Sequence, residues 1–114
     1  MLHEVNVVLE RIDVLLGGAP PVPELERTLT GGYATALALE GERLRIDKRM
    51  DGVAAAIYED PSGAKELSAL AERRAGVDSD LHRLRERLGV LKQRTREVRA
   101  AVPPPGAVPQ PGLS

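Results

Sequence analysis

Apolar side chains recur along the chain at alternating steps of three and four residues, in three separate segments. The first row is Leu2, Val5, Leu9, Ile12 and Leu16. This spacing puts all five on one face of an α-helix. The sequence GGAPPVP, residues 17–23, ends the row, because glycine often terminates a helix and proline cannot continue one. We therefore expect a short helix over about residues 1–16.

The second row continues through two adjacent glycines, Gly31 and Gly32. Its positions are Val22, Leu25, Leu29, Gly32, Ala36, Leu39, Arg43, Ile46, Met50, Val53 and Ile57. The spacing of three and four residues keeps its phase across the glycine pair. A loop at the glycines would not be expected to preserve that phase. A continuous helix over about residues 23–59 is therefore expected, even though each interior glycine costs roughly 1 kcal/mol relative to alanine. The alternative is a kink or a short break near residue 31.

A third row follows the break at EDPSGAK, residues 59–65, where Asp60 or Ser62 can cap a new helix. Its positions are Leu67, Leu70, Arg74, Val77, Leu81, Leu84, Leu88, Leu91, Thr95, Val98 and Val102. The two long rows each sustain about five heptads, which is the pattern of coiled-coil packing. Helices of matched length joined by a short turn fold back on each other. The sequence thus predicts a long antiparallel, coiled-coil-like hairpin whose second helix covers about residues 62–102.

The hairpin predicts which residues meet along its seam, the line where the two long rows pack together. Counting outward from the turn places Gly32 and Ala36 opposite the stretch 88–95, so that small residues face large ones. Arg43 and Arg74 interrupt the seam. We expect them at different heights, each meeting an apolar residue and extending its charge to solvent.

A further set of apolar side chains falls outside the seam of the second helix. Its members are Tyr33, Leu37, Leu44, Ala54 and Tyr58. A two-helix hairpin would leave them in water, and such a patch usually marks another packing surface. Either the N-terminal helix covers it, giving a three-helix bundle, or a second chain does, giving an oligomeric helical bundle. We expect self-association, with the N-terminal helix as a latch that covers these residues or is exchanged between chains.

Composition supports an all-α fold. Of 114 residues, 42% are hydrophobic, yet the chain has no Phe, Trp or Cys, and a core without bulky rings suits closely packed helices. We expect one helical domain over residues 1–102 and a disordered Pro-rich tail over residues 103–114. No apolar run approaches the roughly 20 residues of a membrane span, and the N-terminal stretch carries acids, unlike a signal peptide. A cytoplasmic location is therefore expected, and the excess of Arg over Lys, 13 to 3, points to a GC-rich bacterial genome.

Charge divides the chain into an acidic and a basic part. Residues 1–60 hold 11 acids and 6 bases, whereas residues 61–114 hold 6 acids and 10 bases. The basic stretch offers an alternative site, a nucleic-acid-binding face made of Arg83, Arg87, Arg94 and Arg99. The favoured interpretation is a solvated helix whose cations face the acidic part across the hairpin. The whole chain is slightly acidic, and no aromatic side chain lies among these cations for base stacking.

Candidates for catalysis or metal binding are few. Asp78, His82 and Glu86 are spaced by four and line one helical face, as a metal or acid–base set would, but ordinary surface pairing accounts for them. The glycine clusters lack both the P-loop lysine and the GxGxxG spacing. We therefore expect no catalytic residue, no metal and no cofactor.

The sequence predicts a non-enzymatic protein–protein interaction module, which would serve as an oligomeric scaffold, an adaptor or a small chaperone-like binding protein. Its predicted contact residues are Tyr33, Leu37, Leu44 and Tyr58. Its predicted partners are a second copy of the chain and another protein. The alternative function is a nucleic-acid-associated regulator that uses the basic face of the C-terminal helix.

Overall fold

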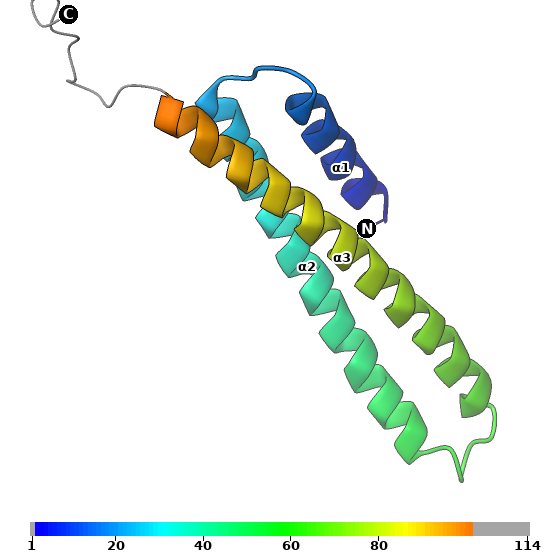
Figure 1. The fold of residues 1–114 in the computed structure, drawn as a ribbon. Helices are drawn as coiled ribbons and strands as arrows, with labels where there is room; N and C mark the ends of the chain where they lie inside the picture. Colours follow the sequence, from blue (N-terminus) through cyan, green and yellow to red (C-terminus); the bar gives the residue numbers. More distant parts are fainter. Residues whose placement is uncertain (1, 102–114) are drawn as a thin grey trace, which may run out of the picture.

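A computed structural model of the chain describes residues 2–101 and consists of three helices (Figure 1). They are α1 (Leu2–Leu16), α2 (Val22–Ala55) and α3 (Gly63–Ala101). α2 and α3 run antiparallel as a long hairpin, and α1 lies beside the half of that hairpin remote from its connection. The described residues contain no strand, and the all-α prediction is confirmed. The predicted tail, residues 103–114, lies outside the described residues.

Proline sets the start of α2. Pro21 is extended (φ −68°, ψ 151°) immediately before the helix, and Pro23 lies in its first turn. At that position the missing N–H leaves no intrahelical hydrogen bond unmade. The predicted helix start at this point is confirmed.

The connection between α2 and α3 takes residues 56–62, more than the hydrophobic pattern predicts. The N–H of Ala56 is shared between the carbonyls of Gly52 at 3.3 Å and Val53 at 3.2 Å, and the N–H of Ile57 bonds to the carbonyl of Ala54 at 3.4 Å. These bonds form a tighter turn than an α-helical one, and the helix ends. The expectation that this helix continues to residue 59 is therefore wrong. The two helices are already in contact beside this connection, since a Cβ on Gly63 would lie 3.1 Å from Val53 Cγ1.

The predicted seam is confirmed along both long helices. Every described seam position is buried or half-buried, and α2 runs unbroken through Gly31 and Gly32. A Cβ on Gly32 would overlap Cδ2 of Leu88, so the expected pairing of a small residue with a large one is also confirmed. Thr95, a polar seam position, is buried and donates its hydroxyl to the carbonyl of Leu91 at 2.8 Å.

The hydrophobic core has two parts of different thickness. Beside α1, buried side chains of all three helices form one cluster, made of Val5, Ile12, Leu15, Leu25, Ala36, Leu39, Leu81, Leu84, Leu88 and Leu91. Towards the connection only α2 and α3 contribute, and the second cluster is the smaller set Ile46, Val53 and Leu70. The end of the hairpin beside α1 therefore buries more apolar surface than the end at the connection.

A polar layer lies where the two clusters meet, beside Val77, which packs against both. Arg43 and Arg74, the charged seam residues, each contact Asp78 at 3.2 Å, and Arg74 also binds Asp47 at 2.5 Å. The hydrogen bond with Asp47 raises the pKa of Arg74 above its usual value. The sequence pattern does not predict this shared carboxylate. The side chains of Arg43 and Arg74 remain 36% and 41% exposed, so both charges still reach solvent.

A second ion-pair group joins α2 to α3 next to this layer. Glu42 binds Arg45 of its own helix at 2.9 Å and Arg73 of α3 at 2.8 Å. The hydrogen bond from Arg45, together with the positive charges of Arg45 and Arg73, holds the pKa of Glu42 below its usual value. Acids of α2 thus face cations of α3, as the charge distribution predicts.

Candidate protein-binding surface

Three large apolar side chains stand exposed on the outer side of α2. Tyr33 is 47% exposed, Leu37 69% and Leu44 60%. Their separations of four and seven residues put them on one face of a helix that repeats every 3.6 residues, along about 16 Å. We call these three residues the α2 outer row. The row is the part of the predicted contact site that the fold brings together.

Tyr58, the fourth predicted contact residue, lies apart from the α2 outer row. It belongs to the connection at residues 56–62 and is 97% exposed. Because α2 ends at Ala55, the helical spacing that would have aligned Tyr58 with Leu44 no longer applies. The two tyrosines therefore belong to different surfaces, one on the shaft of the hairpin and one at its tip.

α1 packs on a different side of α2 and leaves the α2 outer row uncovered. Thr28, Gly31 and Thr35 of α2 line a pocket together with residues of α1, and Leu37 follows Thr35 by two residues, a rotation of about 200°. The predicted arrangement in which the N-terminal helix covers the row is therefore wrong. α1 instead buries Val5, Ile12 and Leu15 in the cluster shared by all three helices.

Ion pairs hold α1 on that side. Arg11 of α1 lies 3.3 Å from Glu24 of α2, and Asp13 of α1 pairs with Arg87 of α3. Each long helix thus contributes one charged partner to α1. Burial sets most of the energy, since exposed ion pairs are worth only a few tenths of a kcal/mol to about 1 kcal/mol.

Charged residues border the α2 outer row on its α3 side. Glu40, between Leu37 and Leu44 on the same face, pairs with Arg85 of α3. Further along this side Glu26 pairs with Arg99 at 2.5 Å. The row is therefore an apolar strip with a polar rim, the usual make-up of a helix face that packs against another protein.

The four arginines of the alternative nucleic-acid site do not form one open cationic face. Arg83 binds Asp80 at 2.9 Å, Arg87 binds Asp13, and Arg99 binds Glu26. Arg94 is half-buried. Three of the four guanidinium groups therefore already lie beside carboxylates of the same chain, and a phosphate would have to displace them.

Asp78, His82 and Glu86, the candidate metal or acid–base set, do not come together in the structure. Asp78 turns to Arg43 and Arg74 in the polar layer, while His82 Nε2 lies 3.4 Å from Glu86 Oε1 at the exposed surface. Within residues 2–101 no group of three such side chains is placed to hold a metal ion.

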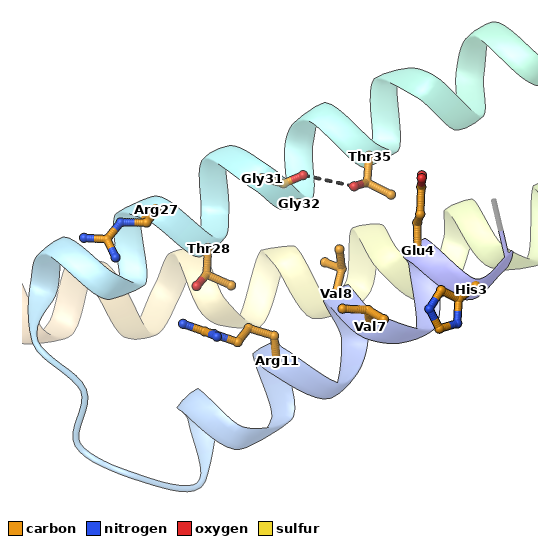
Figure 2. Close-up of a pocket in the computed structure, with 10 residues that line it drawn as sticks. All are labelled: His3, Glu4, Val7, Val8, Arg11, Arg27, Thr28, Gly31, Gly32 and Thr35. Atoms are coloured by element: carbon orange, nitrogen blue, oxygen red, sulfur yellow. Dashed lines mark hydrogen bonds between the residues drawn. The ribbon is translucent and has the colours of Figure 1, made fainter.

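The structure has a groove between α1 and α2 that the sequence pattern does not predict. It has a volume of about 520 Å³ and is lined by His3, Glu4, Val7, Val8, Arg11, Arg27, Thr28, Gly31, Gly32 and Thr35 (Figure 2). We call it the α1–α2 groove. The glycine pair was the signal that could have found it: Gly32 admits Leu88 on one side, whereas a Cβ on Gly31 would meet no atom within 4 Å.

No helix in the described part of the chain is both long and apolar enough to cross a membrane. No protein-family model, curated protein or solved structure matches the chain.

Proposed function

We propose that this protein is a non-enzymatic helical protein–protein interaction module that self-associates through the α2 outer row. The proposal rests on one observation: Tyr33, Leu37 and Leu44 are large, exposed and aligned on one helix face, away from α1. Aligned apolar side chains on a soluble helix commonly mark a packing surface for another helix. We also propose a cytoplasmic location, on sequence grounds alone.

A second copy offers a self-complementary partner for the row. If two α2 helices packed antiparallel across a two-fold axis midway between Tyr33 and Leu44, Tyr33 of one chain would face Leu44 of the other, and this contact would occur twice. Burying the exposed part of each side chain contributes about 1–2 kcal/mol, or roughly 6–12 kcal/mol for six side chains. Association costs an estimated 4–15 kcal/mol. The two figures are of similar size, and a weak, concentration-dependent dimer is expected.

The test compares the mass of the protein with that of Leu37→Ala/Leu44→Ala, measured by sedimentation equilibrium from about 5 μM to about 500 μM. The parent should move from one towards two chains over this range, whereas the variant should stay at one. Far-UV circular dichroism should keep its helical signal, because both leucines are exposed.

Val14→Ala/Val90→Ala is the matched control, since both valines are exposed and lie outside the α2 outer row. It should assemble like the parent. A parent that remains monomeric at every concentration, or a control that loses assembly as fully as the leucine variant does, would contradict self-association through this row.

A further inference from the structure

The geometry of the α1–α2 groove points to a second binding surface, and we propose that it receives an acidic amphipathic helix of a partner protein. This inference is independent of the α2 outer row, because the groove opens on a different side of α2. The two can therefore fail separately.

Apolar side chains and glycine backbone line the middle of the groove. Val7 and Val8 of α1 face Gly31 and Gly32 of α2, two positions without side chains (Figure 2). Gly32 is needed inside the chain, since Leu88 occupies the space where its Cβ would be. Gly31 meets nothing within 4 Å of a Cβ, so bare backbone lines the groove there. A glycine of this kind lets another helix approach closely.

The two ends of the groove differ in charge. Arg11, Arg27 and Thr28 lie together at one end, and His3 and Glu4 lie at the other (Figure 2). Arg11 forms an ion pair with Glu24 at 3.3 Å, whereas Arg27 enters no ion pair among residues 2–101. The first end is thus net cationic and complements a carboxylate of the partner.

The shape of the groove favours a helix over a small molecule. Most of its lining residues, including Val7, Arg11 and Gly31, are exposed to solvent, and only Gly32 is buried. Small-molecule sites enclose most of their ligand, which an open trough between two helices does not. A helix laid along the trough would place apolar side chains on Val7 and Val8 and an acid near Arg11 and Arg27.

Two synthetic peptides test the proposal on the full-length protein. Both are capped, about 18 residues long, and carry leucines at steps of three and four; one has glutamates near one end of its polar face and its twin has lysines. The acidic peptide should bind with a Kd below about 1 mM and shift the amide NMR signals of Val7, Val8 and Gly31. Its lysine twin should bind at least about tenfold more weakly.

A variant of Gly31 separates binding from folding. Gly31→Leu fills the groove but improves helix propensity, so the thermal midpoint should stay level or rise while binding of the acidic peptide falls at least about tenfold. Gly52→Ala is the control, because its Cβ also meets nothing within 4 Å and it does not line the groove. It should bind normally.

Any of four results would overturn the inference: no shift at the groove amides, equal binding of the two peptides, full binding by Gly31→Leu, or shifts centred on Leu37 and Leu44. The last would place the peptide on the α2 outer row. Loss of self-association by Leu37→Ala/Leu44→Ala has no bearing on it.

Discussion

The adjacent glycines of α2 allow a direct test of how closely the two long helices pack. Gly31 and Gly32 share a helix and a neighbourhood, yet one opens on the α1–α2 groove and the other abuts Leu88. Replacing each by alanine changes helix propensity by the same amount. The difference between Gly31→Ala and Gly32→Ala therefore isolates the contact with Leu88.

The expected size of that difference follows from two opposing effects. Alanine in place of an interior glycine stabilises a helix by about 1 kcal/mol, and Gly31→Ala should gain this in full. Gly32→Ala gains the same amount but forces its methyl group against Cδ2 of Leu88, which is only 1% exposed and surrounded by core side chains. Overpacking of this kind costs about 1–3 kcal/mol, so Gly32→Ala should be about 1–3 kcal/mol less stable than Gly31→Ala.

Urea unfolding followed at the helical circular dichroism band measures both variants, at one protein concentration because self-association would add to apparent stability. A Leu88→Ala background provides the control: once the leucine is shortened, Gly32→Ala should stabilise as Gly31→Ala does. Equal stabilities of the two glycine variants in the parent background would refute the reasoning. Leu88 would then move aside freely, and Gly32 would not set the distance between α2 and α3.

Two further predictions concern ion pairs. Because the folded-state pKa of Glu42 is lowered from 4.5, Glu42 adds stability above that value, and this stability is lost as the pH falls through the lowered pKa. Glu42→Gln should therefore lose less stability than the parent between about pH 6 and about pH 3. Glu72→Gln, at an exposed position outside the ion pairs of residues 2–101, should follow the parent. Asp78→Asn, which removes the charge with little change in helix propensity, should destabilise the fold by up to about 1 kcal/mol, since Arg43 and Arg74 lose their shared carboxylate. Added salt should narrow that gap, and an unchanged midpoint at low salt would contradict the prediction.

The sequence was sufficient to predict the hairpin because its signal is repeated many times. Eleven seam positions in each long segment agree on one phase, and a single glycine or arginine does not disturb such a pattern. The continuity of α2 through Gly31 and Gly32 and the pairing of Gly32 with Leu88 both follow from that phase. The end of α2 was placed too late because Ile57 fits the period, although the chain must already turn there.

The polar layer shows a different limit of periodicity. The pattern identifies Arg43 and Arg74 as seam residues, but it ranks positions by polarity and does not say which carboxylate a guanidinium will reach. Asp78 and Asp47 lie next to the seam and not in it, and their contacts with these arginines depend on side-chain length and on the exact register of the hairpin. An arginine at such a layer pairs with carboxylates beside the seam while its side chain stays partly exposed to solvent.

The docking side of α1 is the feature that decides what the rest of the surface offers. A helix of 15 residues is about 22 Å long and can cover only one side of one half of the hairpin. Apolar side chains on more than one face of α1 would let it pack against either side of the hairpin. On the side that it takes, Val5, Ile12 and Leu15 enter the cluster around Leu88. That choice creates both candidate surfaces at once. It leaves the α2 outer row open on one side, and on the other it places Val7 and Val8 opposite a glycine pair, so that a groove remains where two helices with ordinary side chains would have closed it.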